Sequence, residues 1–196
     1  MKNYINRLIW KSNYYNPIED RNKALKFAKI RNKKILDMGT GKGYVAILAA
    51  KNFNCDVTTI DISKEKIKIA KENAKKEKVF DKIKFKEGNA IKTPFLKNSF
   101  DAVISFNALH HTKKNFKKVI AEMFRVSKNK VIITELNGTG AKIFDKYIHP
   151  KENHQAMILN LNDLRNFLKQ YSDTIKIFKR RLMNTFVCEK LMGRKK

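Results

Sequence analysis

The chain carries the stretch ILDMGTGKG at residues 35–43. An apolar run at residues 34–38 leads directly into Gly39, Gly41 and Gly43, and a helical pattern follows at once. Glycine in such a turn lets the chain bend tightly and lets the backbone approach a ligand, while the first turn of the helix offers unpaired N–H groups. The stretch therefore predicts a ligand pocket between a strand and a helix.

The spacing of these glycines excludes two common nucleotide-binding motifs. A dinucleotide fingerprint needs G-x-G-x-x-G, but the position of its third glycine is held by Tyr44. A P-loop needs Gly-Lys followed by Ser or Thr, whereas Gly41-Lys42 is followed by Gly43. What remains is D-x-G-x-G-x-G, in which Asp37 stands beside the turn and is expected to face a cationic group. Asp61 ends the next apolar run, where doubly wound folds place a carboxylate that binds ribose hydroxyls.

Apolar runs and amphipathic helical stretches alternate from residue 33 onward, which is typical of βαβ units and a parallel sheet. The predicted strands are 34–38, 55–61, 83–87, 102–106, 130–136, 174–179 and 185–189, and the predicted helical stretches are 43–51, 64–78, 114–126 and about 141–171. The last two strands are separated by a short turn and fit an antiparallel pair at one edge. We therefore predict an α/β, doubly wound, mostly parallel seven-stranded sheet with an antiparallel C-terminal strand pair.

The chain shows no internal repeat, low-complexity tract or linker, so we expect one domain over residues 1–196. Its predicted parts are an N-terminal helical lid (1–30), a cofactor-binding core (33–136), a substrate-side helical region (139–171) and an edge hairpin (174–190). The lid consists of two short helices separated by a break at Asn16-Pro17. It brings Trp10, Tyr14 and Tyr15, which either exclude water from the pocket or simply pack the helices.

Composition sets the broad class of the protein. With 196 residues, 42% of them hydrophobic, the chain can bury a core without disulfides or metals. Cys55 and Cys188 are far apart and are expected to be free thiols in a reducing cytoplasm. We expect neither secretion nor a membrane span, because no apolar stretch has the required length.

The charge balance is unusual, with 44 Lys and Arg against 18 Asp and Glu, a formal net charge of +26. Such an excess favours a polyanionic partner such as RNA. The alternative is a general lysine bias, because the basic residues are spread along the whole chain instead of forming one tail. Charge alone therefore does not identify the substrate.

Residues 33–136 resemble the class I S-adenosylmethionine-dependent methyltransferases, especially the ubiquinone/menaquinone-biosynthesis-like (methyltransferase type 11) group. The resemblance is carried by ILDMGTGKG at 35–43, by Asp61, by GNAIKTPF at 88–95 and by FDAVISFNALHH at 100–111. It implies S-adenosylmethionine as cofactor, S-adenosylhomocysteine as product and a seven-stranded Rossmann-like fold. It also implies cofactor binding by Asp37, Gly39, Thr40, Gly41, Gly43, Asp61, Ile62, Asn89, Ala90 and Phe106.

Within that set, the resemblance places the glycine loop under the methionine moiety, Asp61 on the ribose, and Asn89 with Ala90 on the adenine. The adenine position is more often Asp in the family. Asn89 offers a carbonyl acceptor without charge, so we expect adenine binding to be tuned differently and not lost.

Histidines are the candidate catalytic residues. His110 and His111 follow the fourth predicted strand, and either could act as a general base or be purely structural. His149 and His154 lie after the fifth strand and, with Glu135, suggest a polar cluster over the acceptor. Two histidines and a carboxylate could also bind a metal, but such spacing is common by chance, so we predict no metal site.

The acceptor is not identified by the sequence. A small molecule fits the resemblance, with residues 139–171 as the substrate cap, and no obligate partner is evident. RNA is the first alternative, although no Asn/Asp-Pro-Pro-Tyr/Phe motif and no cysteine follow the fourth strand. A protein acceptor and a non-catalytic cofactor-binding module are further alternatives.

Overall fold

The computed structural model describes residues 15–150, 153–154 and 158–191. Its strands are β1 (Lys34–Met38), β2 (Asp56–Asp61), β3 (Ile83–Glu87), β4 (Phe100–Phe106), β5 (Ser127–Leu136), β6 (Thr174–Lys179) and β7 (Met183–Glu189). Its helices are α2 (Pro17–Phe27), α3 (Tyr44–Phe53), α4 (Lys64–Lys76), α5 (Phe116–Val126), α6 (Gly138–Ile143) and α8 (Leu161–Leu168). Shorter helical turns are η1 (Phe80–Lys82), η2 (Leu109–Asn115) and the π-helical η3 (Phe144–Ile148).

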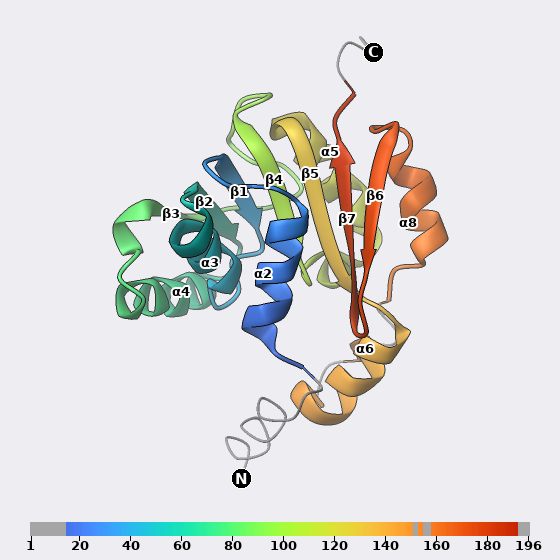
Figure 1. Ribbon diagram of the computed structural model, residues 1–196, viewed down its shortest axis with the longest axis horizontal. Coiled ribbons are helices and arrows are strands. Elements are labelled where there is room, and N and C mark those ends of the chain that lie inside the picture. The colour runs from blue at the N-terminus through green and yellow to red at the C-terminus, as the bar shows by residue number, and fades with distance from the viewer. Residues whose placement is uncertain (1–14, 151–152, 155–157, 192–196) are drawn as a thin grey trace.

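The strands form one seven-stranded sheet in the order β3-β2-β1-β4-β5-β7-β6 (Figure 1). Neighbouring strands from β3 to β5 are parallel, whereas β7 is antiparallel to both β5 and β6. The predicted fold class is confirmed, including the antiparallel pair at the edge. Three predicted strands, at 34–38, 83–87 and 174–179, have the observed bounds, and the other four differ by one to three residues at their first residue.

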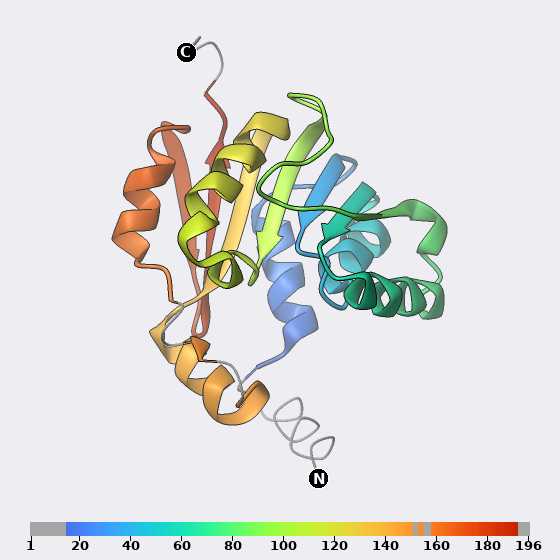
Figure 2. The same ribbon diagram turned by 180° about the vertical axis from the view of Figure 1, so that it is seen from behind.

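Helices cover both faces of the sheet. Figure 1 looks onto the face that carries α2 and α3, where alanines and aliphatic side chains of these helices and of α4 are buried against the sheet. Figure 2 looks onto the opposite face, where α5 and α8 bury a second cluster that includes Met123 and Leu168. Two apolar layers of this kind are what a doubly wound sheet requires.

The N-terminal part is only partly described. The first helix predicted there, with Trp10 and Tyr14 of the predicted lid, lies outside the described residues. The second is α2, and the predicted break at Asn16-Pro17 is its start. The side-chain oxygen Oδ1 of Asn16 accepts from the N–H groups of Ile18 and Glu19, and proline takes the first helical position.

The predicted helical region at about 141–171 divides into α6, η3 and α8. Proline at position 150 disfavours helical geometry at the preceding residue, and His149 is accordingly non-helical, with φ −133° and ψ 64°. Asn160 then caps α8 through the N–H groups of Asn162 and Asp163.

Two contacts with the β6–β7 turn hold α6 and α2 in place beyond the carboxyl edge of the sheet. Gly140 of α6 packs so closely on the β6–β7 turn that a Cβ atom there would collide with the carbonyl oxygen of Leu182. From the same turn, the buried Arg180 guanidinium reaches α2 and lies 2.6 Å from both the carboxylate and the backbone oxygen of Asp20. The turn therefore anchors α2 and α6 over the strand ends.

Candidate functional site

The glycine loop bends back over the end of β2. Gly39, Gly41 and Gly43 have φ values of +99°, +50° and +82°, the left-handed region that glycine adopts without steric cost. The N–H groups of Gly39 and Thr40 both donate to the carbonyl oxygen of Ile60, at 2.9 and 3.0 Å. A Cβ added to Gly41 would meet no atom within 4 Å, so the outer side of the loop is open to a ligand.

Asp61 braces this loop at the end of β2. Its half-buried carboxylate accepts the Gly41 N–H at 3.0 Å and the Ser63 N–H at 3.0 Å. A carboxylate has about four lone-pair sites. Asp61 can therefore hold the loop and still accept hydrogen bonds from ligand hydroxyls.

Asp37 lies behind the loop and is completely buried. It accepts the Thr59 hydroxyl at 2.9 Å, and the Thr59 oxygen lies 2.7 Å from the Thr40 hydroxyl, so a chain of hydrogen bonds joins β1, β2 and the loop. The other carboxylate oxygen, Oδ1, has no hydrogen-bond partner within the described part of the chain. Burial raises the pKa of Asp37 to about 7, and the Asp61 charge adds to the effect, although the Thr59 hydrogen bond opposes it.

A buried histidine–carboxylate pair lies beyond β4. Glu135 of β5 accepts the N–H groups of Ala108 and Leu109 with Oε1, at 3.1 and 2.9 Å. Its other oxygen, Oε2, lies 2.6 Å from Nδ1 of His110. His110 and Glu135 are both nearly inaccessible to solvent, and Nε2 of His110 has no hydrogen-bond partner in the described structure.

A second such pair comes from the segment after β5. Nδ1 and the backbone N–H of His154 both lie 2.7 Å from Oδ1 of Asp145 on η3. The His154 ring lies 5.4 Å from the His110 ring and 5.9 Å from the His149 ring, measured between centroids. His111 is exposed, and its ring lies 4.1 Å from that of His110. The four predicted histidines therefore form one cluster.

One cavity of about 550 Å³ joins this cluster to the glycine loop. The predicted site residues that line it are Gly39, Thr40, Gly41, Asp61, Phe106, His110, His111, His149 and His154. Asp37, Gly43, Ile62, Asn89 and Ala90 are absent from its described lining. Ile62 is 72% exposed, and the Asn89 carbonyl already accepts the Ile91 N–H at 2.9 Å, so the predicted adenine contacts stay predictions.

Arg21 is a cavity residue that the sequence did not reveal. Its guanidinium carbon lies 4.6 Å from the Phe106 ring centroid and 5.4 Å from that of Tyr44, within the range of cation–π attraction. The Arg21 guanidinium also donates to the Tyr15 hydroxyl at 3.3 Å. Tyr15, the described aromatic residue of the predicted lid, is buried edge-on against Phe144 and lines the cavity. The sequence around Arg21 contains no recognisable motif, and the chain has many other basic residues. Only the folded structure therefore shows that Arg21 lines the cavity.

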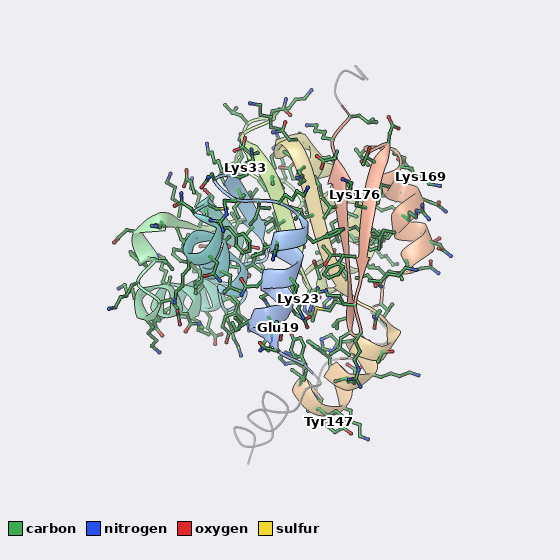
Figure 3. All side chains as sticks on the ribbon, in the orientation of Figure 1. Glu19, Lys23, Lys33, Tyr147, Lys169 and Lys176 are labelled. Carbon is green, nitrogen blue, oxygen red and sulfur yellow. The ribbon has the colours of Figure 1, made fainter. Side chains whose placement is uncertain are left out.

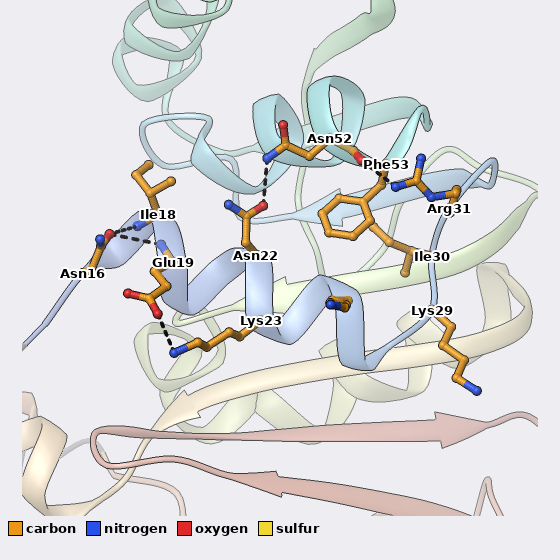
Figure 4. Close-up of a pocket in the computed structure, with 11 residues that line it drawn as sticks. Asn16, Ile18, Glu19, Asn22, Lys23, Lys29, Ile30, Arg31, Asn52 and Phe53 are labelled. Carbon is orange, nitrogen blue, oxygen red and sulfur yellow. Dashed lines mark hydrogen bonds and ion pairs between the residues drawn. The ribbon is translucent and has the colours of Figure 1, made fainter.

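A second, shallower hollow of about 750 Å³ lies between α2 and α3 (Figure 4). Its walls carry Lys23, Lys26, Lys29 and Arg31, and Asn22 and Asn52 are hydrogen-bonded across it at 2.9 Å. None of its described lining belongs to the glycine loop or to the histidine cluster. It is therefore separate from the candidate site.

The described residues contain no group of three or more His, Cys, Asp or Glu side chains placed to bind a metal ion. Cys55 and Cys188 are free thiols, and both are buried. No helix in the described ranges is both long enough and apolar enough to cross a membrane.

Residues 35–130 match a family model described as a methyltransferase domain. This segment is a class I S-adenosylmethionine-dependent methyltransferase domain. A methyltransferase structure from Aquifex aeolicus superposes with a TM-score of 0.69 over 97% of this chain and 99% of that one, at 18% identity, which shows the shared fold. The ubiquinone-like subgroup stays a prediction.

The curated relatives of the methyltransferase domain act on different acceptors. Norajmaline N-methyltransferase of Rauvolfia serpentina is 32% identical over 53% of this chain and 37% of the relative. A release factor glutamine methyltransferase of Flavobacterium psychrophilum is 42% identical over 41% of this chain and 28% of the relative. The chain spans about a third of these relatives, so they do not identify its acceptor.

The residues of the methyltransferase domain fit S-adenosylmethionine. The open side of Gly41 leaves room for close approach, and Asp61 keeps lone pairs for the ribose hydroxyls. Arg21, which precedes this segment, adds a guanidinium to the cavity lining that suits the carboxylate of the amino-acid moiety, and Asp37 lies buried behind the loop with one unpartnered oxygen. The cofactor supplies, when bound, a methyl group on a positively charged sulfur.

Proposed function

We propose that the protein is an S-adenosylmethionine-dependent methyltransferase that acts on a small-molecule acceptor. The observation that supports this most strongly is the single cavity that joins the glycine loop to the histidine cluster. Its volume of about 550 Å³ is within the range of small-molecule sites. Norajmaline and ajmaline N-methyltransferases among the relatives agree with a small acceptor.

The chain's own residues divide the work in this proposal. Asp61 binds the ribose hydroxyls, and Asp37 and Arg21 face the ammonium and the carboxylate of the methionine moiety. Gly39, Thr40, Gly41 and Gly43 form the floor beneath that moiety, Phe106 packs beside it, and Ile62, Asn89 and Ala90 contact the adenine. Methyl transfer is an in-line displacement, which an enzyme accelerates mainly by holding the acceptor in line and away from water.

The acceptor side is formed by His110, His111, His149 and His154. Phe144 and Tyr15 close this side with buried aromatic surface, which excludes water. We also infer a cytoplasmic location, because the two unpaired thiols suit a reducing compartment.

Calorimetric titration with S-adenosylmethionine and S-adenosylhomocysteine tests the cofactor site. Asp61→Ala removes charge-assisted hydrogen bonds and should weaken both ligands by about tenfold or more. Asp56→Ala is the matched control, because Asp56 begins the same strand and is exposed. If the wild-type protein binds neither ligand, the proposal fails.

RNA is a second candidate acceptor because of the net charge of +26. In Figure 3, Lys33 lies beside the start of β1, apart from Lys169 and Lys176, which lie near α8 and β6, so these labelled lysines come from more than one region. Transfer of a labelled methyl group to bulk RNA, to protein, and to a small-molecule fraction of a cell extract decides between the acceptor classes. Label in the small-molecule fraction supports our proposal, whereas label in RNA or protein overturns it.

A further inference from the structure

We propose that His110 is the general base of the reaction, that Glu135 is its positioning residue, and that the acceptor carries an O–H group. This inference rests on the proposed function and deepens it. It is based on the buried pair between β4 and β5 and on the charges that line the cavity.

The hydrogen bonds of Glu135 determine which nitrogen of His110 holds the proton. Backbone N–H groups can only donate, so Oε1 of Glu135 is taken by Ala108 and Leu109. Oε2 of the ionised carboxylate also accepts, and its neighbour at 2.6 Å is Nδ1 of His110. In the neutral imidazole Nδ1 must therefore carry the single proton, which leaves a lone pair on Nε2.

Nε2 of His110 is the atom without a described hydrogen-bond partner. The two ring nitrogens point in different directions, so Nε2 points away from Glu135. His110 is also part of the cavity lining. Burying a polar atom without a hydrogen bond is costly, and such an atom in a native site calls for an explanation. An O–H group of the acceptor would provide the donor that Nε2 lacks.

The cavity charges favour a neutral or anionic acceptor over an ammonium compound. Among the described residues, its lining includes the cations Arg21, Lys42 and Lys66 and one carboxylate, that of Asp61. The ionisable groups nearest to His110 from each neighbouring element are Glu135 on β5, His111 on η2, and Asp145, His149 and His154 on and after η3. Each carboxylate of that group is already paired with a histidine.

The proposed step transfers a methyl group to the acceptor oxygen and a proton to His110. The acceptor oxygen forms a bond to the methyl carbon, the carbon–sulfur bond breaks with its electron pair remaining on sulfur, and the acceptor proton moves to Nε2 of His110. The resulting imidazolium is stabilised by the Glu135 carboxylate and later releases the proton to solvent. The products are the methyl ether or ester and S-adenosylhomocysteine.

The first test is the tautomer of His110, measured by two-bond ¹H–¹⁵N correlation spectra of the full chain at about pH 8.5, about two pH units above the ordinary imidazole pKa. We expect the Nδ1–H form in at least about tenfold excess, which corresponds to about 1.4 kcal/mol. Glu135→Gln should invert this ratio: the backbone N–H groups hold the amide oxygen, so the amide NH₂ faces Nδ1 and the proton moves to Nε2. Glu87→Gln is the matched control, because Glu87 also ends a strand but is exposed, and it should leave the ratio unchanged.

The second test uses three small probes on the wild-type protein, so it does not depend on the folding of any variant. Phenol should shift the Nε2 resonance of His110, whereas anisole, which lacks the hydroxyl, and benzylamine, which is cationic at this pH, should not. A proton on Nε2 in the wild type, or equal effects of phenol and anisole, overturns the inference. A response to benzylamine alone makes the acceptor an amine and overturns the O–H assignment.

Titration of S-adenosylhomocysteine into the same samples separates the two proposals. If it binds while His110 fails these tests, the base assignment is wrong and the proposed function stands. If it does not bind, the proposed function fails, whatever the tautomer is.

Discussion

Replacing Asp37 by asparagine removes a completely buried carboxyl group whose pKa is strongly raised. Burial raises the pKa of Asp37 from 3.8 to about 7. Asparagine keeps an oxygen for the Thr59 hydroxyl and removes the charge, so Asp37→Asn is nearly isosteric. The folded protein holds the Asp37 proton more tightly than the unfolded chain does. The contribution of protonated Asp37 to the free energy of unfolding is therefore fully present below about pH 4, and it is lost as the pH rises to about 7.

The size of this effect follows from the shift of about three pKa units. At about 1.4 kcal/mol per unit, ionised Asp37 lowers the free energy of unfolding by at most about 4 kcal/mol above pH 7. The pKa shift runs from 3.8 to about 7, and about two of its three units lie in the range between pH 5 and 7. The stability advantage of Asp37→Asn over wild type should therefore grow by about 3 kcal/mol between pH 5 and 8.

Urea unfolding of both proteins at pH 5, 6, 7 and 8 measures this difference, and the comparison cancels all other titrating groups to first order. Asp81→Asn is the control, because Asp81 is exposed on η1 and its replacement should give a constant difference. A pH-independent difference between Asp37→Asn and wild type would refute the reasoning.

In the same pH range, an ammonium near Asp37 would favour its ionised form, so affinity for S-adenosylhomocysteine should rise with pH in the wild type and not in Asp37→Asn.

Three further predictions concern packing and burial. Gly140→Ala should lower the free energy of unfolding by about 1–3 kcal/mol in urea because the added methyl collides with the β6–β7 turn, whereas Gly138→Ala, which has open space, should not. Arg180→Ala should lower the free energy of unfolding by about 3 kcal/mol, because it leaves the Asp20 carboxylate on α2 unpaired. The control Lys179→Ala, at an exposed position, should cost about 0.5 kcal/mol or less, and equal losses would contradict the role of the Arg180–Asp20 pair. Burial raises the pKa of the Cys188 thiol to about 12, so iodoacetamide at about pH 8 should label it only after denaturation, and rapid labelling of the native protein would show that it is accessible.

The sequence by itself determined the sheet and the position of the glycine loop. Strand patterns are local, because an apolar run between turn signals marks its own ends, and β1, β3 and β6 were predicted to the residue. The glycines were equally readable, because positive φ values and close approach demand that residue type. The gathering of the four histidines could be anticipated in part, since loops that follow parallel strands meet at one edge of the sheet.

Only the tertiary structure decided which of these groups meet and what their surroundings do to them. His110 and Glu135 are 25 residues apart, and the 2.6 Å contact between them depends on the register of β4 against β5. Arg21 enters the cavity because Arg180 anchors α2 over the strand ends through Asp20, which lies 160 positions away from Arg180 in sequence. The pKa of Asp37 is raised because the fold removes water from its carboxylate, and desolvation is a property of everything packed around a group, which no local pattern records.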